Sequence, residues 1–493
     1  MPGLEDAPRE DLLALIGELR TVNAALMARI AQQDERIAAQ DKRIAQLERA
    51  LGRNSGNSSM PPSSDDLPGR KVPTRRSGSG GKRGKRPGAP GSGLAWTADP
   101  DRVLPHYPGG SCGCGADLGE ATDEGVARSH QVHDVPLVTR TITQHDLHQV
   151  RCGCGRTHVG ARPQDVQASP ISYGPNLRAL VVYLMVFQHV PVERCARLVA
   201  DLTGAAPSTG FIHGMLTRTA ETLTDVVALI KTLITAAYVA GFDETTLRAG
   251  SAGNRKYVLS ASTESCTLFA LGGRDIASFT DFAVLPAFTG IAVHDRYALY
   301  DHPSLTKTIA GHQLCCAHLL RDLADAAESH PAQHWPEQIS RALRGLIRAA
   351  NTARDNDQAS VPPDIGDPLI LELRRGVRVG LAALPRVPGP ASTTKQLPGR
   401  LLLECLRERE DDVLRFAADT RIWPTNNLSE RDLRPHKTQQ KISGRLQSED
   451  ITRDRLTIRS YISTAAKHGI NIMTAIHQAL TGNPWMPPAV AST

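Results

Sequence analysis

The sequence lacks the pattern of a secretory leader and of a membrane-spanning segment, so we expect neither. Its first residues, Met-Pro-Gly-Leu-Glu-Asp, contain neither a positively charged region nor an apolar run. The most apolar stretch, 177–190, is interrupted by Arg178 and Gln188 and is too short to span a bilayer. We therefore expect a cytoplasmic protein without membrane contact, in which the nine cysteines stay mostly reduced.

A strong overall charge is also lacking. The 57 lysines and arginines barely exceed the 51 aspartates and glutamates, and a net charge of +6 says little about nucleic acid binding. The 40% hydrophobic and 22% charged residues are typical of a globular protein. Because 493 residues are too many for one core, we expect three or four structural units.

Residues 12–51 carry the seven-residue repeat of a coiled coil. Apolar or tolerated residues recur at alternating steps of three and four, at Ile16, Leu19, Asn23, Leu26, Ile30, Gln33, Ile37, Gln40, Ile44, Leu47 and Leu51. In this register arginines occupy the g positions and acids occupy the e positions, so each arginine would face an acid of a parallel partner helix. Asn23 at an a position also favours a parallel dimer. The alternative, a lone amphipathic helix, leaves the charge pairing without a purpose.

Residues 52–95 are rich in Ser, Gly and Pro and have no hydrophobic period, which predicts a disordered linker. Eight of them are basic: Arg70, Lys71, Arg75, Arg76, Lys82, Arg83, Lys85 and Arg86. A flexible basic tether can contact phosphates without reading sequence. The alternative is a solvated linker without a ligand.

Two copies of Cys-Gly-Cys-Gly, at Cys112/Cys114 and Cys152/Cys154, mark residues 96–170 as a small β unit. Alternating polar and β-branched stretches between them, such as residues 140–150, predict strands. A hairpin that joined the two pairs would place four thiolates around a structural Zn²⁺, as in a zinc ribbon. The Cys-x-Cys spacing is shorter than the usual Cys-x-x-Cys, and reduced thiols without metal are the alternative.

Residues 171–235 have helical periodicity. A helix from Val192, a short turn that contains Gly204, and a second helix capped by Ser208 follow one another. This order is typical of a helix-turn-helix, although many helix pairs of this kind never touch DNA.

Residues 236–300 change to strand character. Strands are predicted at 238–243, 256–262 and 267–271, then a helix near 279–286, and then a fourth strand at 289–295. The first three strands can form an antiparallel meander, from which the helix crosses over to the fourth. The remaining residues, 301–493, are predicted to be largely helical, with a Pro-rich break at 385–390.

Asp243 and Asp295 each end an apolar strand. A carboxylate at the end of a core strand is costly to bury unless it binds a cation. If the two strands lie side by side, the carboxylates repel each other, and a divalent metal relieves that repulsion. Oxygen ligands favour Mg²⁺ or Mn²⁺. The alternative for each Asp alone is a turn or a helix cap.

Glu430 is the best third acid. It stands three residues after Asn427, a spacing that fits a helix-capping box equally well. Basic residues follow it and could hold a DNA backbone: Arg431, Arg434, Lys437, Lys441 and Arg445. Pro435 is expected to kink or end the helix.

A further helix is predicted from His312 to Glu328. Cys316 and His318 on it point about 200° apart, so they cannot share a metal ion, and helix packing is the preferred role of His318.

With these motifs in this order, the chain resembles transposases of the insertion sequence 66 family. The similar segments begin at Leu51 (Leu-Gly-Arg-Asn-Ser-Gly-Asn-Ser-Ser-Met-Pro-Pro-Ser-Ser-Asp), Gly84 (Gly-Lys-Arg-Pro-Gly-Ala-Pro-Gly), Tyr173 (Tyr-Gly-Pro-Asn-Leu-Arg-Ala), Asp243 (Asp-Glu-Thr), Val293 (Val-His-Asp), Cys316 (Cys-Ala-His-Leu-Leu-Arg-Asp-Leu) and Asn427 (Asn-Leu-Ser-Glu-Arg-Asp-Leu-Arg). The resemblance implies a multidomain α+β protein with an RNase H-like DDE core over 236–445. It also implies a helical insertion at about 301–420 and a C-terminal helical region over 446–493. Asp243, Asp295 and Glu430 are its implied catalytic acids.

The resemblance implies a bacterial, nucleoid-associated enzyme that cleaves DNA at the ends of an insertion sequence and transfers the strands. Its implied partners are the terminal inverted repeats, target DNA, a second copy of the chain bound through the coiled coil, and accessory proteins of the same element. Three alternatives stay open: an inactive or domesticated DNA-binding relative, a nuclease that cuts without transfer, and a coiled-coil scaffold.

Overall fold

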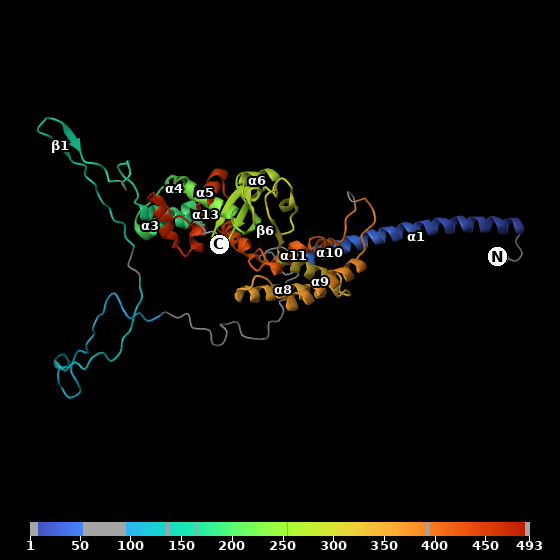
Figure 1. The fold of residues 1–493 in the computed structure, drawn as a ribbon, viewed down its shortest axis with the longest axis horizontal. Helices are drawn as coiled ribbons and strands as arrows, with labels where there is room; N and C mark the ends of the chain where they lie inside the picture. Colours follow the sequence, from blue (N-terminus) through green and yellow to red (C-terminus); the bar gives the residue numbers. More distant parts are fainter. Residues whose placement is uncertain are drawn as a thin grey trace. The chain divides into compact units, whose positions relative to one another are not determined.

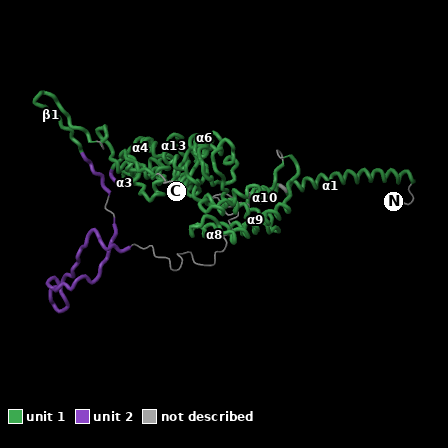
Figure 2. Tube along the Cα trace, viewed as in Figure 1, with its two compact units in different colours: residues 1–74, 144–201, 205–493 green, residues 75–143, 202–204 purple. Residues whose placement is uncertain are grey.

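The computed structural model describes residues 8–52, 95–134, 138–163, 166–253, 255–390 and 394–488. The chain divides into two compact units, residues 1–74, 144–201 and 205–493 in the first and residues 75–143 and 202–204 in the second (Figure 2). Residues 53–94 of the predicted basic linker lie outside the described residues. Within the described ranges, no helix combines the length and the apolar character needed to cross a bilayer.

The predicted coiled-coil segment forms a single helix, α1 (Arg9–Gly52), of 44 residues (Figure 1). Its apolar heptad residues, among them Leu19, Leu26, Ile30 and Ile37, are all exposed in this single chain. The helix is therefore present, while its pairing with a second chain stays a prediction.

The segment around the cysteine pairs has little regular structure. The second unit contains a short 3₁₀ helix, η3 (Leu118–Glu120), and the first contains a two-stranded hairpin of β1 (Gln149–Arg151) and β2 (Thr157–Val159). The strand predicted over 140–150 is wrong for residues 140–148, which have no strand conformation. Alternation alone does not make a strand, because Ile142 and its neighbours are exposed and bury no face.

The next segment is helical, as predicted. It consists of α2 (Pro175–Val182), the π-helix η4 (Tyr183–Phe187), α3 (Val192–Thr203), α4 (Thr209–Thr222) and α5 (Thr224–Thr235). The predicted cap of α4 is confirmed, because the Ser208 hydroxyl accepts the Phe211 N–H at 3.1 Å.

A five-stranded mixed sheet follows, in the order β5-β4-β3-β6-β7. Its strands are β3 (Val239–Leu247), β4 (Lys256–Ser262), β5 (Thr267–Gly272), β6 (Ile291–His294) and β7 (Gly311–Leu314). The predicted antiparallel meander of the first three strands is confirmed, and α6 (Ile276–Phe282) with the 3₁₀ helix η5 (Leu285–Ala287) connects them to β6, which is parallel to β3.

The fifth strand corrects the helix predicted from His312. Residues 311–314 pair in parallel with β6, and the helix α7 begins only at Cys316 (Cys316–Ser329). Gly-His-Gln-Leu has no β-branched residue, so its strand conformation comes from the pairing with β6 and not from local propensity.

Helices cover both edges of this sheet. On the β5 edge, Ser460 and Thr464 of α13 (Glu449–Lys467) accept the backbone N–H groups of Phe269 and Thr267 at 2.9 and 3.1 Å. On the β7 edge, the Gln313 side chain donates to the Val413 carbonyl and accepts the Phe416 N–H of α11 (Glu410–Ala418). On the β7 edge, Arg415 also donates to the His312 carbonyl at 2.8 Å, so backbone groups that an edge strand would leave free are bonded on both sides.

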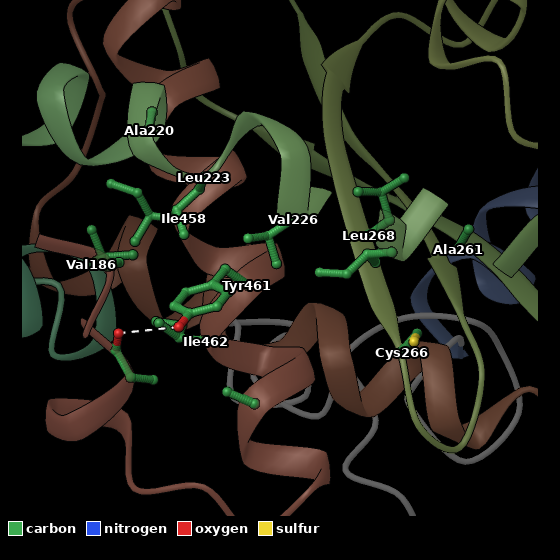
Figure 3. Close-up of a cluster of buried hydrophobic side chains, with 14 of the residues drawn as sticks. Val186, Ala220, Leu223, Val226, Ala261, Cys266, Leu268, Ile458, Tyr461 and Ile462 are labelled. Atoms are coloured by element: carbon green, nitrogen blue, oxygen red, sulfur yellow. Dashed lines mark hydrogen bonds between the residues drawn. The ribbon is translucent and has the colours of Figure 1, made fainter. Parts of the chain in front are cut away.

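Two large hydrophobic cores and a smaller cluster around Phe269 and Leu433 hold the first unit together. One joins the sheet to helices α2, α4, α5, α13 and α14 (Ile472–Leu480), and there the Tyr461 hydroxyl donates to the Ala475 carbonyl at 3.1 Å (Figure 3). The other fills a helical region of α8 (Trp335–Asp355), α9 (Pro363–Ala383), α10 (Pro398–Glu408) and α11, with Trp335 buried at its centre. The predicted Pro-rich break separates α9 from α10.

Candidate active site

Asp243 on β3 lies level with Asp295, which directly follows the neighbouring strand β6. Residues 239–241 of β3 pair in parallel with residues 291–293 of β6, and each aspartate follows two residues after the last pair. Neighbouring strands lie about 4.8 Å apart, so the two backbones are within reach of a shared ion. The prediction that these strands lie side by side is confirmed.

Asp243 does not end its strand, contrary to the prediction. The strand β3 continues to Leu247, and Asp243 pairs with Ser260 on the antiparallel side. Only the parallel pairing stops here, because β6 ends at His294. Asp295 is the first residue after β6, so it lies beside the part of β3 that has no parallel partner.

Glu244 faces away from Asp243, as strand alternation predicts. The Tyr300 hydroxyl donates to one of its carboxylate oxygens at 2.5 Å, and Arg274 pairs with the other at 2.5 Å. Burial raises the pKa of Glu244, while these two partners favour its charged form. Because its oxygens are already engaged, Glu244 is not a competing metal ligand.

The helix α12 (Asn427–Ile442) packs directly on β3 at Gly241. A Cβ atom at Gly241 would lie 2.4 Å from both the Asn426 Oδ1 and the Ser429 Oγ. The Asn426 side chain donates to the Phe242 carbonyl at 2.7 Å, and its backbone N–H lies 3.1 Å from the Cys315 sulfur. The start of α12 is therefore fixed to β3 and α7, and glycine is the residue that allows this approach.

Glu430 lies in the first turn of α12, just beyond these contacts. The capping box predicted as its alternative role is not formed, because the helix is capped by Asn426 and no side chain makes the capping bond. The Glu430 Oε1 lies 3.5 Å from an Arg321 nitrogen and 3.8 Å from the His318 Nδ1, both on α7. The side chain thus faces the site and not its own helix end.

The three acids predicted as a site act on one another electrostatically. The pKa of Asp243 is raised well above its ordinary value of 3.8, first by burial and then by the charges of Glu244, Asp295 and Glu430. A cation bound beside Asp243 would offset this repulsion between its carboxylate and the neighbouring acids. Oxygen donors from two strands and one helix suit a hard divalent ion.

Comparison with known protein families identifies the family of the chain. Residues 170–453, more than half of the chain, match the family described as "Transposase IS66 family". The chain belongs to the IS66 transposase family. Residues 1–95 match a family of unknown function, and no curated protein matches the chain.

Among the described residues, Asp243, Asp295 and Glu430 do not form a group whose ligand atoms all lie within 4.8 Å of one another, whereas two other sets of residues in the IS66 match do. Cys315, His318 and Glu430 have ligand atoms within 4.8 Å of one another, as do His294, Asp301 and His312. Cys316, by contrast, is fully buried and its sulfur lies 3.7 Å from the Val413 carbonyl, so it does not share an ion with His318, as predicted. The sequence interpretation missed Cys315, although a spacing of three residues from His318 is the signal that could have found it.

The buried side chain of His294 contacts the backbone of Asp295. Its ring is fully buried, with one nitrogen on the Asp295 carbonyl and the other 2.8 Å from the His312 Nδ1. Burial, and then the charge of His312, lower the pKa of His294 to about 3, so the ring is neutral at physiological pH.

The predicted DNA-contacting residues divide into two groups. Arg431, Arg434, Lys437 and Lys441 are exposed along α12 at helical spacing. Arg445 lies beyond the helix and donates to the carbonyls of residues 250 and 251 at 3.3 and 3.1 Å, so it holds a loop. Of the kink or end predicted at Pro435, the end does not occur, because α12 continues to Ile442 and keeps the lysines on its face.

The two Cys-Gly-Cys-Gly segments form similar turns. The Cys112 N–H donates to the Ala116 carbonyl at 2.8 Å, and the Cys152 N–H donates to the Arg156 carbonyl at 2.8 Å. Gly115 and the equivalent glycine of the second turn have φ values of 93° and 88°, which a side chain would disfavour. The glycines thus let the same tight turn form twice.

The hairpin predicted to join the two cysteine pairs is not what the structure shows. The hairpin β1-β2 carries Cys152 and Cys154 in its own connection, in the first unit, whereas Cys112 and Cys114 belong to the second unit. Within the described ranges, none of the four is in a group of three or more ligand atoms within 4.8 Å of one another. All four thiols are exposed, and hydrogen bonds lower the pKa of Cys114 and Cys152. Zinc binding by all four therefore stays a prediction.

Proposed function

We propose that this protein is a DNA transposase that cleaves DNA at the ends of a bacterial insertion sequence and joins the freed strands to target DNA. One observation carries the proposal. Asp243 on β3 stands level with Asp295, which directly follows the adjacent parallel strand β6, and Glu430 is delivered to them by a helix that is fixed on β3. The electrostatic coupling of these carboxylates supports a shared cation site.

The strand order supports an RNase H-like core. Three antiparallel strands are followed by two parallel ones, and the first strand of the meander lies at the centre of the sheet beside the fourth. We propose that this sheet is the DDE core, and that the helices α8 to α11 are an insertion between its second and third acids.

Asp243, Asp295 and Glu430 would hold Mg²⁺ or Mn²⁺. When bound, such ions activate the attacking oxygen and stabilise the leaving oxygen of an in-line phosphoryl transfer. The residues of the chain prepare the site. The raised pKa of Asp243 keeps the repulsion among the acids low before a cation arrives, and the charge of Arg321, 3.5 Å from the Glu430 Oε1, favours the ionised form of Glu430.

The basic stripe on α12 begins next to Glu430, so it is placed to position a phosphate backbone beside the acids. Arg434→Gln and Lys437→Gln are each expected to lower the slope of log affinity against log salt by about 1. Arg445→Gln serves as the matched control, because that side chain holds a loop instead. An unchanged slope in both stripe variants contradicts the assignment.

The other parts of the chain fit the handling of two element ends. We propose that α1 pairs two copies, that α3 and α4 form a helix-turn-helix, and that the four exposed cysteines bind a structural Zn²⁺. The exposed heptad face of α1 and the repeated cysteine turns support these assignments. Accessory proteins of the same element and a nucleoid location are part of the same proposal.

The decisive experiment is Mg²⁺- or Mn²⁺-dependent nicking and joining of terminal-repeat DNA by the full chain. Asp295→Asn is expected to abolish both steps, whereas Asp281→Asn, which removes an exposed acid on α6, leaves them unchanged. Equal cleavage by wild type and Asp295→Asn refutes the active site. No cleavage by either indicates a DNA-binding relative without activity, and cleavage without joining indicates a nuclease.

A further inference from the structure

A small cavity lies inside the first unit, where α12 and α13 meet β3 and the end of the π-helix η4. Its lining is Val186, His189, Leu247, His436, Gln439, Leu446, Thr452, Arg455, Leu456 and Arg459. Four of these side chains are cationic or can become so, and none is acidic. The cavity is separate from the three catalytic acids, so a role for it does not depend on the proposed function.

The four basic side chains are almost completely buried. Arg455 and Arg459 on α13 are 7% and 8% exposed, His436 on α12 is 4% exposed, and His189 is 5% exposed. Each keeps a buried polar nitrogen for which the described part of the chain offers no hydrogen-bond partner: Nε of both arginines, Nη1 of Arg459, Nε2 of His436 and Nδ1 of His189. Unpaired buried donors of this kind are rare in folded proteins.

The nearby protein groups do not neutralise the arginines. Arg455 donates to the Met185 carbonyl, and Arg459 lies over the Phe187 ring at 5.0 Å. Asp432 acts on Arg459 at longer range, but its carboxylate already binds Lys467 and Thr267, each at 2.7 Å. Two guanidinium groups therefore share one interior region without a bonded counter-charge.

The arginines do not lose this charge by deprotonation. Burial lowers the pKa of both arginines only to about 10, so they stay charged at neutral pH. Burial also lowers the pKa of His189 to about 4 and that of His436 well below 6.5. The histidines are thus neutral, and each can still turn one N–H toward a ligand. A buried cation without a partner is costly, whereas one that meets an anion is not.

We propose that this cavity binds a small inorganic anion of the size of chloride, held by Arg455 and Arg459 with His189 and His436. The volume decides the class of ligand. The space inside is about 10 Å³, which is room for about one water-sized ligand. A phosphate group is too large, and the exposed arginines and lysines of α12 lie on the other side of that helix.

The position of the anion explains what it would do. His436 and Gln439 face the cavity from α12, and Arg455 and Arg459 face it from α13. An anion between them ties the two helices together and removes the repulsion between the arginines. Because α12 also carries Glu430, the anion stabilises the helix that completes the acidic site.

Thermal unfolding of the full chain in sodium chloride and in sodium gluconate, at equal ionic strength, tests the proposal. Gluconate is too large for the cavity. Wild type is expected to unfold about 2–4 °C higher in chloride, because a ligand that binds only the folded state raises Tm. The same increment is expected in bromide, and crystals grown in bromide are expected to show its anomalous signal between Arg455 and Arg459.

Variants separate a specific site from a general salt effect. Arg459→Met is expected to lose the chloride increment, yet in gluconate it is at least as stable as wild type, because it removes one unpaired buried charge. Arg453→Met, on the exposed side of the same helix, is expected to keep the full increment. Arg459→Lys keeps the charge and part of the increment, which serves if the Met variant fails to fold. An equal chloride increment in wild type and Arg459→Met, or none in wild type, overturns the proposal.

Discussion

Gly241→Ala tests how the third acid is delivered to the sheet. The added Cβ would meet Asn426 Oδ1 and Ser429 Oγ at 2.4 Å, both on short, buried side chains at the start of α12. The first turn of α12 has to retreat by about 1 Å before these contacts reach the 3.4 Å of ordinary packing. Glu430 lies in that turn and moves with it.

Two effects set the expected magnitude. Overpacking costs roughly 1–3 kcal/mol, and loss of the bond from Asn426 to the Phe242 carbonyl adds about 1 kcal/mol. Displacement of a catalytic group by about 1 Å costs on the order of 10²-fold in rate. We therefore expect Gly241→Ala to unfold at lower denaturant and to cleave terminal-repeat DNA about 100-fold more slowly at saturating Mg²⁺.

Two companion variants make the result specific. At Gly210 in α4 a Cβ atom would meet nothing within 4 Å, so Gly210→Ala is expected to be neutral or slightly stabilising. The Ser429 Oγ has no hydrogen-bond partner among the described residues, so Ser429→Ala is expected to be tolerated alone and to restore part of the activity of Gly241→Ala. If Gly241→Ala is as stable and active as wild type, α12 is not fixed in this way and the reasoning fails.

Three further outcomes are expected. Folding raises the pKa of Asp243 above 3.8, so the folded chain binds more protons than the unfolded one, and without divalent metal its stability falls as pH rises above about 4. Asp243→Asn should raise Tm in chelator and flatten this pH dependence while abolishing cleavage; an unchanged pH profile contradicts the raised pKa. Ile30→Lys should convert a dimer to a monomer in light scattering, whereas Gln32→Lys, at a position away from the heptad seam, should not. Cys112→Ser should lower the bound zinc measured by mass spectrometry of metals, whereas buried Cys195→Ser should leave it unchanged.

The sheet was predictable from the sequence because its strands carry their own signal. Residues 238–243 and 289–295 are apolar runs that end in an acid, and a helix between them favours a parallel crossover. The fifth strand was not predictable, because Gly311–Leu314 has no β-branched residue and takes its strand conformation from its pairing with β6. The predicted strand at 140–148 failed for the opposite reason, since it has alternation without a surface to bury.

Local sequence also misjudged the helix that carries Glu430. A capping box and a stop at Pro435 were both reasonable from spacing, yet neither occurs in the structure. The N-cap residue is Asn426, one residue earlier. Its side chain makes no capping bond and donates to the Phe242 carbonyl of β3. Tertiary contacts therefore decided the start of α12, and the sequence had no way to show that Gly241 makes room for it.

This dependence on tertiary contact explains why the three acids were not equally predictable. Asp243 and Asp295 are placed by strand register, which short-range pattern can reveal. Glu430 is 135 residues beyond Asp295 in the sequence, and its place depends on a glycine, an asparagine and a buried cysteine that meet only in the folded chain. A substitution at any of these three contacts should therefore displace Glu430 although Glu430 itself is unchanged. A substitution of Asp243 or Asp295 removes an acid and does not displace Glu430 in this way.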